Sequence, residues 1–133
     1  DQSIPPIVAY AGAWHLVLAT KDKVLHDSLE YDFEQLKAIM LREELTTLQL
    51  IYRESDSLFH SRNPFPVGGV VEDPATGAAA AAFGGYLRDR SIVEAPATIT
   101  LLQGIAMGRP STITVGIPLQ GGITVSGTAI SIE

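Results

Sequence analysis

Residues 62–90 read RNPFPVGGVVEDPATGAAAAAFGGYLRDR and combine a loop, a helix start and a helix built from small residues. Asp73 is a favourable N-cap residue, and Pro74 suits the first helical position. Five alanines and Gly84-Gly85 give this helix little side-chain volume, although glycine costs about 1 kcal/mol relative to alanine in a helix interior. We therefore predict a central helix from Pro74 that other backbone packs closely on nearly every side, wrapped by antiparallel strands.

The segments around this helix are typical of strands. In the last third of the chain, Thr and Ser alternate with Ile, Val and Leu, as expected for a sheet with one buried face. Asp32 and Gln35 indicate a helix start, and the apolar stripe that follows ends near Glu44. A change of face at Gly127 predicts a bulge or bend. We expect strands at 14–20, 24–26, 45–53, 58–62, 98–103, 111–117 and 123–132, and a loop at 63–69.

The length of 133 residues indicates a single domain, residues 1–133. The predicted class is α+β, with an antiparallel, barrel-like sheet curled around a central helix. The chain is 46% hydrophobic, which excludes intrinsic disorder. Only 18% of residues are charged, below the roughly 25% of an average soluble domain. In residues 92–133 the charged side chains are Glu94, Arg109 and Glu133 alone, so we expect a partner to cover part of the surface.

Composition and motifs exclude several classes of protein. The net charge of −6 and the lack of a Lys/Arg cluster argue against nucleic-acid binding. No apolar run approaches the roughly 20 residues of a membrane span, and we expect a cytoplasmic protein. With no cysteine, and with His15, His26 and His60 lacking ligand spacing, no metal site is predicted. The motifs of phosphate-binding loops, dinucleotide enzymes and serine hydrolases are absent.

Asp73 is the first candidate functional residue. The predicted helix start leaves the amides of residues 75–78 free, and these amides favour an anion such as a substrate carboxylate. A carboxylate beside an anion site is suited to proton transfer. The alternative is that Asp73 only caps the helix.

Several motifs then follow one another in an order that resembles the PhzF family of phenazine biosynthesis, which has the diaminopimelate-epimerase-like fold. The resemblance extends from about residue 9 to the C-terminus. The motifs are Arg62-x-Pro-Phe, the string EDPATG at 72–77, Gln103-Gly, MGRPS at 107–111 and Val125-Ser-Gly127.

The resemblance implies two lobes, each a sheet curled around a helix, with the active site in the cleft between them. Such proteins use no cofactor and no metal, and they shift a proton between carbons, as in the isomerisation of a dihydro-hydroxyanthranilate. This chain is similar to the second, C-terminal lobe. Since it begins with Asp1 rather than Met, we expect a processed product, an excised domain or a partial sequence.

The same resemblance suggests the site residues. Asp73 corresponds to an acid or base, and the amides of Gly77 and Ala78 correspond to a cradle for the substrate carboxylate. Thr76 and Glu72 complete the predicted substrate-binding set. Many members carry a serine where this chain has Ala78, so one hydroxyl donor is lost. The essential glutamate and histidine of the family belong to the first lobe and have no counterpart here.

Further residues have both a functional and a structural interpretation. Glu72 either shares a proton with Asp73 or points away from it. His60 and Arg62 either face the cleft or belong to the strand structure. Arg109 either contacts substrate or fixes the backbone of its turn.

Two hypotheses follow for the chain as a whole. In the first, it is half of an isomerase for a small carboxylate-bearing substrate and is inactive without the N-terminal lobe. In the second, it is a non-catalytic lobe that acts as a binding module or dimerises through its cleft face. The expected partners are therefore the substrate and either the missing lobe or a second copy.

Overall fold

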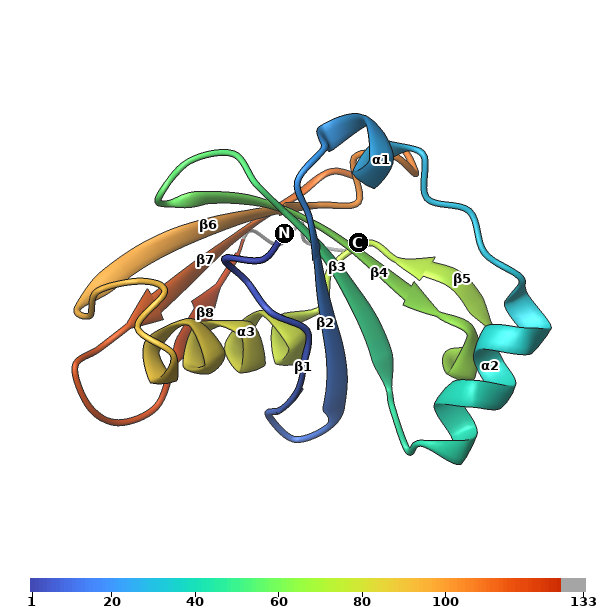
Figure 1. Ribbon diagram of the computed structural model, residues 1–133, viewed down its shortest axis with the longest axis horizontal. Helices are drawn as coiled ribbons and strands as arrows, with labels where there is room; N and C mark the ends of the chain where they lie inside the picture. Colours follow the sequence, from blue (N-terminus) through green and yellow to red (C-terminus); the bar gives the residue numbers. More distant parts are fainter. Residues whose placement is uncertain (128–133) are drawn as a thin grey trace, which may run out of the picture.

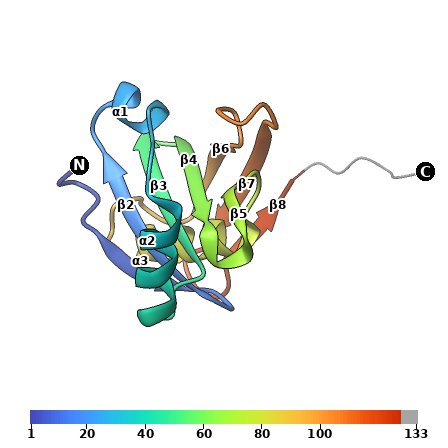
Figure 2. The same cartoon turned by 90° about the vertical axis from the view of Figure 1, so that its right-hand side faces the viewer.

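The computed structural model describes residues 1–127, which form one strongly curved sheet around a helix (Figures 1 and 2). The sheet has the order β1-β2-β3-β4-β6-β7-β8, and β5 pairs with β4 beside this path. The strands are β1 (Ile7–Tyr10), β2 (Trp14–Thr20), β3 (Thr47–Arg53), β4 (Leu58–Phe65), β5 (Val70–Asp73), β6 (Ala97–Gln103), β7 (Ser111–Ile117) and β8 (Thr124–Ser126). The helices are α1 (Lys23–Asp27), α2 (Phe33–Arg42), the short 3-10 turn η1 (Pro66–Gly68) and α3 (Gly77–Asp89).

The sheet is mixed. The pairs β2–β3 and β4–β6 are parallel, whereas the other described pairs are antiparallel, as predicted. Parallel neighbours require a long crossover connection. Residues 21–46, with α1 and α2, supply the first crossover, and residues 66–96, with α3, supply the second. The predicted class, α+β with a sheet curled around a central helix, is confirmed as a half-barrel with few helices.

The core lies between α3 and the concave side of the sheet. Ala80, Phe83 and Leu87 are buried on α3, in one cluster with sheet residues that include Phe59 and Leu101. Phe59 and Phe83 meet edge to face, with ring centroids 5.3 Å apart. The small residues of α3 therefore allow the curved sheet to approach the helix closely.

Gly84 shows why α3 lacks side chains at its centre. A Cβ atom there would lie 2.9 Å from Val115 Cγ1 and 3.0 Å from Ile123 Cγ2. The predicted close packing is confirmed at this position, but the neighbouring atoms belong to side chains and not to backbone. At Gly85 the same Cβ would have a single neighbour among the described residues, Ile123 Cγ1 at 4.0 Å.

The helix α3 was predicted to begin at Pro74, but it begins at Gly77. Asp73 is the last residue of β5, paired with Asn63, and α3 begins at Gly77 with Thr76 as its N-cap. Strand pairing holds Asp73 in extended backbone, so Pro74 follows a strand and does not open the helix. The side chain of Asp73 instead accepts from the Thr76 hydroxyl inside the connecting turn.

Other boundaries differ for equally local reasons. The predicted strand at 24–26 is α1, because the Asp22 side chain caps it by accepting from Val24 N at 2.8 Å. The predicted loop at 63–69 is partly strand, since β4 continues to Phe65 by pairing with β5. The start at Asp32 is confirmed, with its side chain accepting from Gln35 N at 2.9 Å. The predicted bend at Gly127 and strand to 132 reach beyond the described residues.

Two further observations concern residues 1–127 only. None of their helices combines the length and the apolar character that a membrane crossing requires. No three of their His, Asp or Glu side chains gather in the way that a metal ion would need.

Candidate functional site

Asp73 lies at the end of β5, where three segments of the chain meet. Its Oδ2 accepts a hydrogen bond from the Thr76 hydroxyl at 2.8 Å, and its Oδ1 lies 3.4 Å from Ala75 N. Its backbone carbonyl accepts from Gln103 Nε2, at the end of β6, at 2.8 Å. Asp73 is partly exposed, so its carboxylate is held on one side and open on the other.

A depression of about 530 Å³, here called the Asp73 hollow, opens beside this carboxylate. It combines two carboxylates, the Arg109 guanidinium and apolar walls, a composition suited to a small polar ligand with an apolar body. Its lining residues are Phe65, Gly68, Val70, Val71, Glu72, Asp73, Pro74, Met107 and Arg109.

Gly104 determines the position of the turn that carries Met107 and Arg109, two residues that line the Asp73 hollow. Its φ is +80°, and a Cβ atom on it would lie 2.9 Å from the Pro74 carbonyl oxygen and would collide with the Arg109 carbonyl. Arg109 N donates to Gly104 O at 2.9 Å, which closes the turn. The turn at 104–109 lies so close to Asp73-Pro74 that only glycine fits at position 104. The same turn places Arg109 in the lining of the hollow.

Glu72 contributes to the wall of the Asp73 hollow but is already paired. Arg62 Nη2 donates to its Oε1 at 2.7 Å, and Arg62 Nε donates to its Oε2 at 3.2 Å. Successive strand residues point to opposite faces, so Glu72 does not share a proton with Asp73. The interpretation in which it points away is the one that the structure supports. Arg62 is correspondingly a structural residue, since it also donates to the Asp27 carbonyl at 2.8 Å.

The N-terminus of α3 follows Asp73 immediately. Thr76 is the N-cap residue, but its side chain makes no capping bond to the helix because it is directed to Asp73. Gly77 and Ala78 are exposed, and the first amides of a helix have no intrahelical acceptor. Neither residue lines the Asp73 hollow, so the structure places the predicted cradle at the adjoining helix end and not inside that depression.

Two site residues escaped the sequence analysis. Gln103 was recognised only as part of a motif, yet its side chain bonds both Asp73 and Thr76. Asn63 is the cross-strand partner of Asp73 and shares a face with it. Ser61 Oγ donates to Asn63 Oδ1 at 2.6 Å, and within residues 1–127 the Nδ2 of Asn63 has no partner. The four consecutive polar residues at 60–63, in a strand that begins and ends with apolar residues, are the signal that could have drawn attention to Asn63.

The histidines have structural roles. His26 Nε2 lies 3.0 Å from the Leu50 carbonyl, and burial lowers the pKa of His26. Burial likewise lowers the pKa of His15, whose Nδ1 lies 2.8 Å from Thr47 Oγ1. His60 Nε2 lies 3.1 Å from Glu54 Oε1, and none of the three lines the Asp73 hollow.

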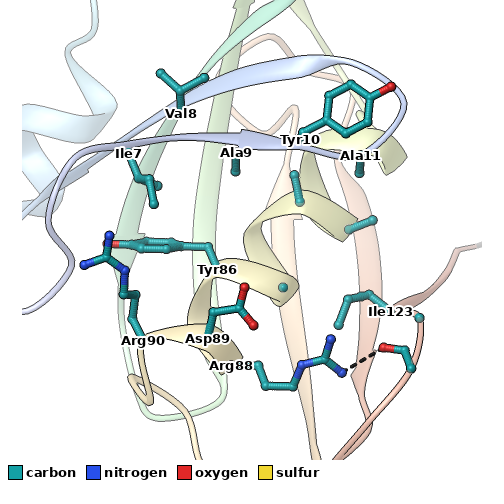
Figure 3. Close-up of a pocket in the computed structure, with 15 residues that line it drawn as sticks. Ile7, Val8, Ala9, Tyr10, Ala11, Tyr86, Arg88, Asp89, Arg90 and Ile123 are labelled. Atoms are coloured by element: carbon teal, nitrogen blue, oxygen red, sulfur yellow. Dashed lines mark hydrogen bonds between the residues drawn. The ribbon is translucent and has the colours of Figure 1, made fainter.

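A larger depression of about 640 Å³ lies between β1 and the C-terminal half of α3 (Figure 3). Tyr86, Arg88 and Asp89 line it, and Arg88 Nη1 donates to the Gly121 carbonyl at 2.8 Å. No predicted site residue belongs to it. Its single carboxylate, on Asp89, is exposed, so the Asp73 hollow is the stronger candidate site.

The chain is similar to several known proteins. A curated relative, an uncharacterized isomerase of Mesorhizobium japonicum, is 42% identical over 71 residues, which are 50% of this chain and 22% of the relative. A PhzF-family phenazine biosynthesis protein of Bacillus anthracis superposes with a TM-score of 0.72 at 17% identity, over 94% of this chain and 45% of that one. A predicted epimerase of Pseudomonas aeruginosa superposes with a TM-score of 0.71 at 24% identity, over 95% of this chain and 44% of that one.

These similarities differ in what they show. The structural likeness, at such low identity, establishes the fold, and the chain spans less than half of either solved structure. The model of one family, described as phenazine biosynthesis-like protein, matches residues 1–133. It confirms the resemblance carried by the motifs around Asp73 and Gln103. The chain therefore belongs to the phenazine biosynthesis-like family, PhzC-PhzF.

Proposed function

We propose that this chain is the C-terminal half of a cofactor-independent isomerase that moves a proton between two carbons of a small carboxylate-bearing substrate. The observation that carries the proposal is the partly exposed Asp73 carboxylate at the Asp73 hollow, directly before the uncapped N-terminus of α3. Family membership supports the reaction class, as does the similarity to an uncharacterized isomerase.

The proposed chemistry uses one carboxylate twice. The ionised Asp73 accepts a proton from a substrate carbon, and the electron pair of that C–H bond enters the conjugated system of the substrate. The neutral acid then returns the proton to another carbon, so no atom or electron is gained or lost. The free amides of Gly77 and Ala78 hold the substrate carboxylate, and they stabilise negative charge that spreads onto it.

Arg109 and the walls of the Asp73 hollow complement this arrangement. Arg109 belongs to the turn that packs against Pro74 at Gly104. Within the described part of the chain, the Arg109 side chain has no hydrogen-bond partner. It supplies positive charge to the same hollow as Asp73. Ala78 contributes a backbone amide alone, so the bound carboxylate receives one hydroxyl donor fewer than in members with serine.

We further propose that the chain is inactive by itself. Proton transfer to carbon requires a base that is shielded from water and matched to its substrate. Here Asp73 is open to solvent on one side. A second lobe, facing the Asp73 hollow and the start of α3, would exclude that water.

Deuterium incorporation tests the proposal. The chain alone, and the longer protein that contains it, are incubated with a dihydro-hydroxyanthranilate in D₂O, and deuterium on substrate carbon is followed by NMR. We expect exchange and isomerisation with the longer protein, none with the chain alone, and none with Asp73→Asn. Turnover that survives Asp73→Asn would disprove the role of Asp73.

An assembly role is the second candidate function. Tyr10 and Trp14 are 59% and 46% exposed on neighbouring strands at one end of the sheet, with ring centroids 4.8 Å apart. Exposed aromatic pairs of this kind are typical of contact surfaces. Sedimentation of the chain at increasing concentration tests this candidate: a monomer at every concentration contradicts self-association.

A further inference from the structure

We propose that Gln103 is a positioning residue that, through Thr76, determines which oxygen of Asp73 accepts the proton. The inference rests on the proposed function of Asp73 and adds an atomic assignment to it. It is carried by four hydrogen bonds among these three residues.

The first step concerns the amide of Gln103, which is 1% exposed. Its Nε2 donates to the Asp73 carbonyl at 2.8 Å and to Thr76 Oγ1 at 3.0 Å, and its Oε1 accepts from Thr76 N at 3.3 Å. Both hydrogens of the amide are thus in use. A carbonyl can only accept, so the contact with the Asp73 carbonyl places the nitrogen, and not the oxygen, on that side.

The second step concerns the direction of the Thr76 hydroxyl. Its oxygen accepts from Gln103, so its own hydrogen is directed to its other neighbour, Asp73 Oδ2 at 2.8 Å. Without the donor on Gln103, the hydroxyl is free to rotate toward another acceptor. Gln103 therefore acts on the carboxylate without touching it.

The third step concerns the two oxygens of Asp73. Oδ2 receives the Thr76 hydrogen at 2.8 Å, whereas among residues 1–127 Oδ1 has only the long 3.4 Å approach of Ala75 N. The usual N–H···O distance is about 2.7–3.2 Å, so Oδ1 keeps its lone pairs available. The geometry points to Oδ1 as the oxygen that takes the proton from carbon and Oδ2 as the oxygen that is held.

NMR of the isotope-labelled chain tests this arrangement without a substrate. Two signals are followed at pH 7: the hydrogens of the Gln103 amide and the carboxyl carbon of Asp73. In the wild-type chain both amide hydrogens should exchange more slowly than those of Gln35, which is exposed. In Thr76→Val we expect one of the two to lose its protection, and we expect the Asp73 carbon signal to shift.

Three further variants complete the comparison. Thr76→Ser keeps the hydroxyl, and Thr98→Val makes the same change at an exposed threonine of β6; both should leave the two signals as in the wild-type chain. Gln103→Glu keeps the acceptor for Thr76 N but has no hydrogen to donate, so the Asp73 carbon signal should move. An Asp73 signal unaffected by both Thr76→Val and Gln103→Glu overturns the proposal.

Turnover of the longer protein separates this proposal from the proposed function. We expect Thr76→Val to lower kcat about tenfold or more with little change in KM, because the loss concerns the proton-transfer step. Thr76→Ser should restore kcat. If Asp73→Asn retains activity, the proposed function is wrong, whatever the NMR result. If Asp73→Asn is inactive but Thr76→Val keeps its kcat, only the positioning role fails.

Discussion

Arg62 and Glu72 form a buried two-bond ion pair that joins β4 to β5, with side chains only 13% and 7% exposed. The same arginine donates to the carbonyls of His26 and Asp27 at the end of α1. It therefore connects three elements, one of which ends at Asp73. The pair holds the strand that carries the candidate acid and base.

We expect Arg62→Ala to destabilise the chain by about 3–5 kcal/mol, because it leaves the Glu72 carboxylate buried without a counter-charge. The matched control is Arg42→Ala, whose exposed pair with Glu43 is worth at most about 1 kcal/mol. Urea unfolding measures both changes. Equal effects for the two variants would show that the Arg62–Glu72 pair behaves as a surface pair.

Gly84→Ala and Gly85→Ala should have opposite effects. Alanine favours a helix over glycine by about 1 kcal/mol, but at Gly84 its Cβ would approach Val115 and Ile123 to about 3 Å. Overpacking of that kind costs about 1–3 kcal/mol. At Gly85 the nearest atom of residues 1–127 is 4.0 Å away, so the helix preference decides the effect. Thermal unfolding should place Gly84→Ala below and Gly85→Ala above the wild-type chain.

The chain should lose stability as the pH falls below about 6.5. Burial lowers the pKa of His26 and of His15 below the ordinary histidine value of about 6.5. Below that pH the unfolded chain binds protons that the folded chain does not, so the free energy of unfolding decreases with decreasing pH. Melting temperatures at pH 7.5 and 5.5 measure the effect. A double variant with His15→Gln and His26→Gln should show a smaller decrease, and an unchanged wild-type melting temperature contradicts the prediction.

Gln49→Met should stabilise the chain. Gln49 is fully buried, and within the described residues neither its Nε2 nor its Oε1 has a partner. An unsatisfied buried polar group costs about 1–3 kcal/mol, and methionine has a similar shape without that cost. Chemical denaturation measures the change, with Gln35→Met as the exposed control. A less stable Gln49→Met variant would mean that the buried amide is satisfied in solution.

The sequence predicted those features that depend on one local rule. Asp32 is a cap because its side chain reaches Gln35 N, and Gly84 is a glycine because nothing larger fits. The start of α3 was misplaced because pairing with Asn63 extends β5 to Asp73, and that long-range contact cannot be read from Asp73-Pro74. The parallel pairs β2–β3 and β4–β6 were missed because alternating residues do not encode strand direction.

In the candidate site, too, residues close in the chain could be predicted, whereas contacts between distant residues could not. Asp73 and the amides of Gly77 and Ala78 could be suggested from a motif, since they are close in the chain. Glu72 was included because it is adjacent in sequence, although strand geometry pairs it with Arg62. Gln103 lies thirty positions from Asp73, and only the folded sheet brings the two together.

Within residues 1–127, Asp73 is held by Ala75, Thr76 and Gln103. On the proposed function, the candidate acid and base and the residues that orient it therefore lie together on one chain. Substitutions elsewhere, in whatever surface faces the Asp73 hollow, can alter substrate preference during evolution without retuning the acid and base. We therefore expect family members to retain the residues around Asp73 and to differ in the surface that faces the Asp73 hollow.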